Sequence, residues 1–154
     1  MLTYKDILTS ITKTLRYKFG IDVFASTINQ GFNKECFYVS LIGSPSERVA
    51  RNLTQTNLTI SIKYFGDGDT IKLYEMIDRL NRLFSKEIKF KDRVITLSKN
   101  EPNIVTDEIG EFLDFLIPIS FIDALYKTEE EIKQEEDMEL MQEININKEV
   151  IRWV

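Results

Sequence analysis

Residues that could perform acid–base or nucleophilic chemistry are sparse in this 154-residue chain, which contains no histidine. Histidine is the usual general base near neutral pH, and it completes Ser-His-Asp and Cys-His catalytic arrangements. The neighbouring carboxylates of Asp107 and Glu108 lie in a polar, turn-like stretch, where we expect them to be solvated. The sequence therefore predicts a protein that is not an enzyme and has no catalytic residues.

The Gly-Asp-Gly-Asp run at residues 66–69 is the stretch most similar to a ligand site. An EF-hand loop beginning at Asp67 would need an oxygen ligand at position 71 and a glycine at position 72, but Ile71 and Lys72 stand there. No glycine run precedes a Lys-Ser or Lys-Thr pair, so phosphate-binding motifs are missing too. The run instead predicts a turn in which Asp69 caps a following helix, and we expect no metal or other cofactor.

Cys36 is the single cysteine of the chain. It cannot form an internal disulfide, and one thiolate does not assemble a zinc site. Because it lies among strand-like residues, the sequence predicts a structural thiol.

The elements that would position any site are clearest between residues 57 and 84. Apolar and polar residues alternate over the first part, which predicts a strand with one buried face. That face comprises Leu58, Ile60, Ile62 and Tyr64. Apolar residues then recur at helical spacing and predict a helix. Its expected apolar face comprises Ile71, Leu73, Tyr74, Ile77, Leu80, Leu83 and Phe84, and its other side carries the expected i,i+4 pairs Glu75/Arg79 and Asp78/Arg82.

Similar patterns predict the remaining elements. Thr3 and Asp6 resemble a capping box, and the spacing that follows predicts a helix over residues 4–19, ended by Gly20. Strands are predicted at residues 21–26, 36–42, 87–90, 94–98 and 113–121, turns at 101–103 and 107–110, and a loop or short pairing segment at 47–56. Both parities of 36–42 carry apolar residues, so we expect that strand to be covered on both faces.

The predicted strand at 113–121 has the longest alternating apolar face in the chain, formed by Leu113, Phe115, Ile117, Ile119 and Phe121. Pro118 cannot donate to a sheet ladder, so either this strand lies at an edge or its ladder is interrupted there. Taken together, the elements predict an α+β fold: a small antiparallel or mixed β-sheet packed against two main helices, with an acidic C-terminal extension.

Length and composition agree with one domain, since 43% hydrophobic and 29% charged residues are ordinary for a globular protein. We place this domain at residues 1–127 and an acidic arm at residues 128–154. The longest apolar run is broken by Pro118 and Ser120, well short of the roughly 20 residues that span a bilayer. The first residues do not resemble a secretory signal, so we expect the protein to stay where it is made and to need no membrane.

Charge is distributed unevenly along the chain. Residues 128–154 contain nine acidic and three basic residues, so this arm carries minus six while residues 1–127 carry plus one. A nearly neutral body argues against a dedicated nucleic-acid surface, which would show clustered lysine and arginine. Lys86, Lys89, Lys91 and Arg93 form a local basic run, which we interpret as a solvated edge of a hairpin.

The arm also contains more apolar residues than an acidic disordered tail would hold. They include Met138, Leu140, Met141, Ile144, Ile146 and Trp153. Two alternatives stay open: these side chains fold back onto the body, or they dock on another chain, as exposed apolar patches often do.

Several stretches of the sequence resemble the tail terminator, or tail completion, proteins of long-tailed phages, defective prophages and phage-tail-like bacteriocins. The matching segments are Gly31-Phe32, Cys36-Phe37-Tyr38-Val39, Ile62-Lys63-Tyr64-Phe65, Leu73-Tyr74-Glu75-Met76, Leu80, Leu83-Phe84, Asp92-Arg93 and Glu143-Ile144-Asn145. The resemblance covers nearly the whole chain, and residues 147–154 extend beyond its pattern.

This resemblance implies a structural protein that assembles as a ring of about six copies on the head-proximal end of the tail tube. The ring would stop tube polymerisation and present a docking surface. The implied partners are further copies of the chain, the tail tube protein, and sheath or head-completion proteins, first in the bacterial host cytoplasm and then in the particle. Candidate contact residues are Met138, Leu140, Met141, Ile144, Ile146, Trp153, Lys91 and Arg93.

Two alternatives differ in their expected behaviour. A head–tail connector or tube subunit would share the phage setting, and a tube subunit would polymerise by itself, which a terminator should not do. A small ligand-binding domain or enzyme would instead show a substrate-sized apolar pocket with convergent polar groups.

Overall fold

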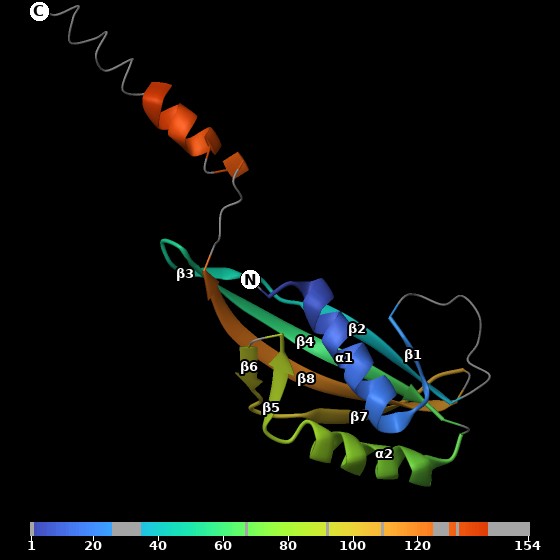
Figure 1. The fold of residues 1–154 in the computed structure, drawn as a ribbon. Helices are drawn as coiled ribbons and strands as arrows, with labels where there is room; N and C mark the ends of the chain where they lie inside the picture. The colour runs from blue at the N-terminus through green and yellow to red at the C-terminus, as the bar shows by residue number, and fades with distance from the viewer. Residues whose placement is uncertain are drawn as a thin grey trace, which may run out of the picture. The chain divides into compact units, whose positions relative to one another are not determined.

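The computed structural model describes residues 2–25, 35–66, 68–91, 93–108, 110–124, 130–131 and 133–141 (Figure 1). The chain divides into two compact units, Met1–Asp123 and Ala124–Val154, which are described separately. The predicted boundary between residues 127 and 128 lies outside the described residues. The first unit is the α+β body that the sequence predicts.

The body is built on a mixed sheet with the strand order β1-β2-β4-β8-β7, in which β3 also pairs with β4. Its strands are β1 (Asp22–Phe24), β2 (Cys36–Gly43), β3 (Glu47–Ala50), β4 (Leu53–Phe65), β7 (Glu101–Thr106) and β8 (Glu111–Ala124). The β1/β2 pair is parallel, whereas β2/β4, β3/β4 and β7/β8 are antiparallel. The mixed character follows from the single parallel pair at the β1 edge.

The two longest strands, β4 and β8, supply most of the sheet's buried face. Leu58, Ile60, Ile62 and Tyr64 of β4 are buried, as are Leu113, Phe115, Ile117, Ile119 and Phe121 of β8. Both alternating patterns are thereby confirmed. The two strands are neighbours, and across them the Ser61 hydroxyl donates to Asp114 Oδ1 at 2.7 Å on the opposite face.

Helix α1 (Tyr4–Phe19) begins and ends where its local signals predict. The Thr3 side chain accepts from the Asp6 amide, the Asp6 carboxylate accepts from the Thr3 amide, and Gly20 ends the helix in the left-handed conformation with φ 65°. Ile7, Ile11 and Leu15 are fully buried in the core.

Helix α2 (Thr70–Leu83) is capped by Asp69, whose carboxylate accepts from the Ile71 amide at 3.0 Å. This cap is confirmed, but the expected apolar face was too wide. Ile71 is 65% exposed and Tyr74 56% exposed, because at 3.6 residues per turn Tyr74 projects well to the side of the buried stripe of Leu73, Met76 and Leu80, and Ile71 projects on nearly the opposite side of the helix. The stripe is therefore narrower than the sequence predicts, and Met76 belongs to it.

A second, two-stranded sheet is formed by β5 (Glu87–Phe90) and β6 (Arg93–Thr96). Phe90 pairs with Arg93, so the connection is a two-residue turn, and Lys91 adopts φ 51° as such turns require. The predicted hairpin is confirmed. Its buried residues, Ile88, Phe90 and Ile95, join the main core.

Two sequence predictions about the sheet need adjustment. Residues 101–103 were expected to form a turn, but Pro102 and Asn103 lie in β7 and pair with β8. The turn prediction is wrong because β7 is an edge strand, where proline is tolerated. Pro118 lies two residues beyond Leu116, the last β8 residue paired with β7, so its missing N–H is not needed by that ladder.

Of the alternatives for residues 47–56, the pairing segment is confirmed, since β3 pairs with the outer end of β4. In β2, Cys36 and Phe37 are both buried, but Ile42 is 52% exposed, so only the first half of this strand is covered on both faces. The Cys36 thiol is buried, and this burial, with a smaller effect of Asp22, raises its pKa. It is a structural thiol, as expected.

Candidate functional site

The polar residues that could have formed a chemical site have structural roles in the body. Asp69 caps α2, and Asp107 Oδ1 accepts from the Gly110 amide at 2.9 Å in the turn between β7 and β8. Within the described ranges, no group of three or more His, Cys, Asp or Glu residues could hold a metal ion. In the same part of the chain, no helix is long and apolar enough to cross a membrane. The candidate sites are therefore surfaces.

The hairpin residues Lys91 and Arg93 lie in a network at one end of the body. Lys91 Nζ is 3.0 Å from Asp6 Oδ2, while the Arg93 guanidinium forms an ion pair with Asp123 and donates to the Ile122 carbonyl at 2.8 Å. Asp123 also accepts from the Leu2 amide at 3.0 Å. The network joins the hairpin, the start of α1 and the end of β8.

The charges in this network differ in their exposure. The Lys91 side chain is 60% exposed, and that of Arg93 is 32% exposed and lies over the Phe121 ring. The pKa of Asp6 is lowered to about 2, because its carboxylate accepts hydrogen bonds from the Thr3 amide and from Lys91. Lys91 is thus the more accessible of the two predicted contact residues.

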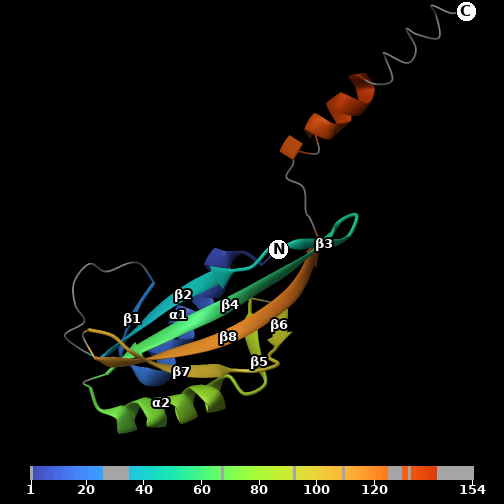
Figure 2. The ribbon, with the colours of Figure 1, turned by 180° about the vertical axis from the view of Figure 1, so that it is seen from behind.

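Among the described residues of the body, no helix lies on one face of the main sheet. The helices α1 and α2 and the hairpin residues contribute to the core on the other face, and Figure 2 shows β2, β4 and β8 in front of α1. The open face mixes polar and apolar contacts. Phe65 and Phe112 stack with ring centroids 5.0 Å apart, and Lys63 lies over the Tyr38 ring at 5.8 Å. We define the open sheet face as Tyr38, Lys63, Phe65, Phe112, Leu116 and Pro118.

The open sheet face was not predicted from the sequence, because the outward parity of β8 was described by Asp114, Pro118 and Ser120 without its apolar residues. The available signal was the opposite parity of β8, where Phe112, Leu116, Pro118 and Ile122 are apolar although this side faces away from the core. Ile122 is 48% exposed.

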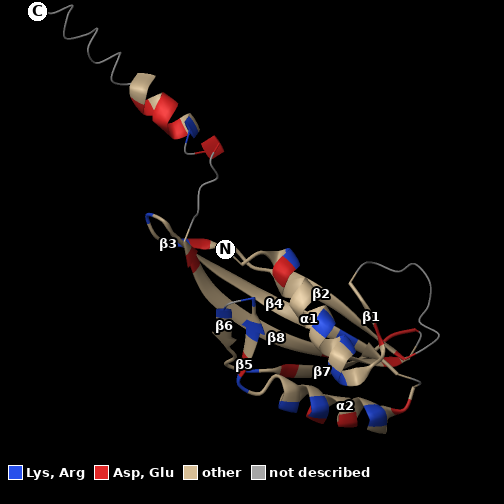
Figure 3. Cartoon of the chain, viewed as in Figure 1, with Lys and Arg blue, Asp and Glu red and all other residues tan. Residues whose placement is uncertain are grey.

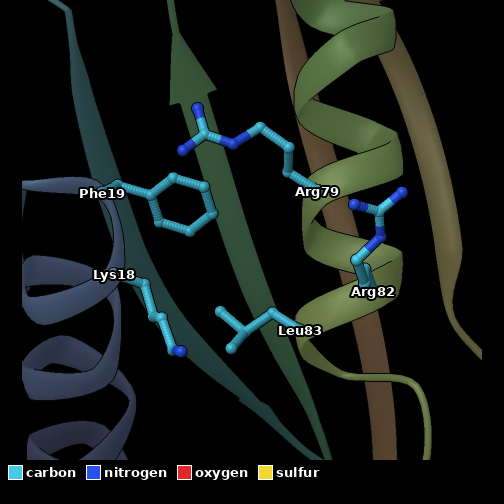
Figure 4. A pocket seen from close by; sticks show the side chains of 5 residues that line it. All are labelled: Lys18, Phe19, Arg79, Arg82 and Leu83. Carbon is cyan, nitrogen blue, oxygen red and sulfur yellow. The ribbon is translucent and has the colours of Figure 1, made fainter.

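A basic groove lies between the two helices of the body (Figure 4). It has a volume of about 430 Å³ and is lined by Lys18, Phe19, Arg79, Arg82 and Leu83. The Arg79 guanidinium lies 4.5 Å from the centroid of the Phe19 ring, a cation–π arrangement. Sequence reasoning placed Arg79 and Arg82 in ion pairs along α2 and did not connect them with α1.

The second unit contains a helical segment at residues 130–131 and 133–141. Three predicted contact residues lie in it, and all are exposed: Met138 61%, Leu140 56% and Met141 68%. The other three, Ile144, Ile146 and Trp153, lie outside the described residues. Figure 3 shows this helix predominantly in the red of acidic residues.

These features define a class of protein: an α+β protein with an open sheet face, a basic groove and an acidic helical segment. A family model described as phage tail terminator protein matches residues 6–150, and the chain belongs to this family. No curated protein matches it. The resemblance predicted from the sequence is confirmed, and the chain is a structural component of a phage tail.

Proposed function

We propose that this protein closes the head-proximal end of a tail tube as a ring of six copies. The observation that carries the proposal is the match to the phage tail terminator family over residues 6–150. In this function the ring stops tube polymerisation and offers a docking surface for the next component of the particle.

The body offers the different surfaces that a ring requires. Contacts in a ring are head to tail, so each copy must present two complementary surfaces. In the described part of the chain, β1 and β7 stand at the two ends of the sheet order, and each is paired on one side within it. One edge can face one neighbour and the opposite edge the next, while Lys91 and Arg93 add charges near the closing strand β8.

The open sheet face supports contacts with the tube. It combines stacked aromatic rings with hydrogen-bonding side chains, such as Gln55 donating to Ser120 Oγ at 2.9 Å. Protein interfaces typically have such a mixture of aromatic and polar groups. We assign this face to the tail tube protein, and propose that sheath or head-completion proteins bind after the ring forms in the host cytoplasm.

We further propose that residues 1–127 form the folded body and residues 128–154 an arm that docks on another chain. In the described part of the chain, the members of the core cluster lie between Leu2 and Phe121. The arm combines charge minus six with exposed methionines, which suit contacts between unlike surfaces because their side chains are adaptable.

Electron microscopy of particles from a producer strain that lacks this protein tests the proposal. We expect tubes of irregular or excessive length without an end ring, and regular tubes after the wild-type protein is supplied. Tubes of normal length that fail only to acquire heads would instead assign the protein to the head–tail connectors. Long tubes formed by the purified protein alone would assign it to the tube subunits.

A further inference from the structure

We propose that the basic groove, lined by Lys18, Phe19, Arg79, Arg82 and Leu83, binds the acidic arm of a second copy of this chain. The inference rests on the proposed function, in which several copies join in a ring. It names the surface on the body that receives the arm.

The groove combines positive charge with an apolar floor. In Figure 4, Phe19 of α1 and Leu83 of α2 project toward each other, and Lys18 and Arg79 lie beside them. Within the described ranges, no acidic residue is among those that line the groove. The C-termini of α1 and α2 each add roughly half a negative charge here, which three cationic side chains exceed.

Arg79 is held in a geometry that suits a carboxylate ligand. Its guanidinium lies over the face of the Phe19 ring at 4.5 Å, which restricts the side chain and leaves the N–H groups at the guanidinium edge for acceptors. A planar guanidinium can donate two parallel hydrogen bonds to one carboxylate. The groove is therefore suited to carboxylates presented beside an apolar side chain.

The arm presents this combination on one helix. Residues 130–141 contain six acidic residues and one lysine. Met138 and Met141 are three positions apart and share a helix face, Asp137 precedes Met141 by four positions, and Glu135 precedes Met138 by three. The two methionines can contact Phe19 and Leu83 while the flanking carboxylates reach the arginines.

A second copy is the occupant that the proposed ring supplies. Lys18 and Phe19 lie at the end of α1 opposite the Leu2 amide that binds Asp123. The sixteen residues of α1 separate these ends by about 24 Å, a distance that the arm can span. Because arm and groove are different surfaces, their pairing between copies is head to tail, the type of contact that closes a ring.

Cysteine crosslinking of two full-length variants tests the inference. One copy carries Arg82→Cys and a size tag, the other carries Asp137→Cys, and both are mixed at high concentration with a short bismaleimide. The native Cys36 is buried and is not expected to react. We expect a crosslinked heterodimer at a yield at least about tenfold above that of a matched control with Lys63→Cys, which lies on the open sheet face.

Charge reversal provides the second readout. Arg79→Glu combined with Arg82→Glu should abolish a crosslink between Lys18→Cys and Asp137→Cys copies, while unfolding midpoints report whether the body remains folded. The other copy is then changed to carry Asp137→Lys and Glu139→Lys, with the cysteine placed by Glu136→Cys. This second charge reversal should restore the crosslink. Restoration would not follow from a general loss of stability.

Three outcomes would overturn the inference. They are no heterodimer in purified protein or in assembled tails, crosslinking only within single chains that carry both Arg82→Cys and Asp137→Cys, and a heterodimer yield with Arg82→Cys no higher than with Lys63→Cys. Tail length is measured separately. Tails of regular length in a strain that lacks this protein, together with an intact crosslink, would refute the capping function and leave arm docking in place.

Discussion

At the scale of single residues, carboxylates organise the ends of the helices and join separate parts of the body. Asp6 completes the capping box of α1 and also binds Lys91 of the distant hairpin. Asp69 caps α2, and Asp123 binds both Arg93 and the Leu2 amide. These acidic residues stabilise the fold of the body. The chain belongs to a family of phage tail structural proteins.

Replacing Asp69 with alanine should lower the free energy of unfolding by about 1 kcal/mol, because the first amides of α2 lose their side-chain acceptor. Asp69→Asn keeps an acceptor at the cap and should lose only a small part of this energy. Urea unfolding of the three proteins measures the difference. Equal stability of wild type and Asp69→Ala would show that the Ile71 amide finds another acceptor.

The depressed pKa of Asp6 predicts an acid-dependent loss of stability. Its pKa falls from 3.8 to about 2 in the folded protein. The folded state therefore favours the charged carboxylate, and its contribution is complete above the unfolded pKa and is lost as the pH falls toward 2. The urea midpoint of wild type should decrease between about pH 5 and pH 2 more steeply than that of Asp6→Asn. Parallel pH profiles would contradict the assignment.

At the scale of elements, local signals predicted the helices better than the strands. The capping box and Gly20 determine both ends of α1 within the helix itself, so the sequence suffices to place it. The strand β7 was missed because Pro102 and Asn103 have turn propensity, and only pairing with β8 makes them extended. Tertiary contacts overrode local preference there.

The candidate surfaces also differ in how far they could be predicted from the sequence. The sequence itself shows that Met138 and Met141 lie in an acidic segment with many apolar residues, and it therefore marked them as candidate contact residues. The basic groove was not predictable, because Lys18 and Arg79 come from helices far apart in the chain and meet only after both pack on the sheet. Helix packing, and no local pattern, brings them together.

Neighbouring residues on β8 should respond differently to truncation because they face opposite sides of the sheet. Ile117 is fully buried, and Ile117→Ala should lower the free energy of unfolding by about 2–5 kcal/mol through lost burial and a cavity. Leu116 lies on the open face and is only partly buried, so Leu116→Ala should cost less than about 1.5 kcal/mol. Denaturant unfolding of both variants checks this. Equal costs would mean that the open face is packed as tightly as the core.

At the scale of the whole molecule, the body and the arm combine two kinds of interaction. The body holds the core cluster from Leu2 to Phe121, a nearly neutral charge and an open sheet face, whereas the arm holds the negative charge and exposed methionines. In the proposed function, the subunit stays separate while its surfaces are solvated and associates when a growing tube supplies the complementary surface. Such a division suits a component that acts once, at the end of assembly.

Truncation to residues 1–127 should separate folding from function. The fragment keeps both capped helices, the six-stranded sheet and the hairpin, so it should unfold cooperatively with a midpoint close to that of the full chain. It lacks the arm, with its net charge of minus six and its apolar residues, so it should fail to cap tails in a strain without the full-length protein. A matched control, the full chain with Lys133→Ala, keeps the acidic and apolar residues of the arm and should still cap.

Each part of the truncation experiment can contradict the arm proposal independently. An unfolded fragment would mean that residues 128–154 complete the core, the fold-back alternative that the sequence left open. A folded fragment that yields tails of normal length would mean that the arm is dispensable for capping. Only a folded fragment that leaves tails irregular agrees with an arm whose apolar and acidic groups are buried on a partner, where the ordering cost arises on docking and not on folding.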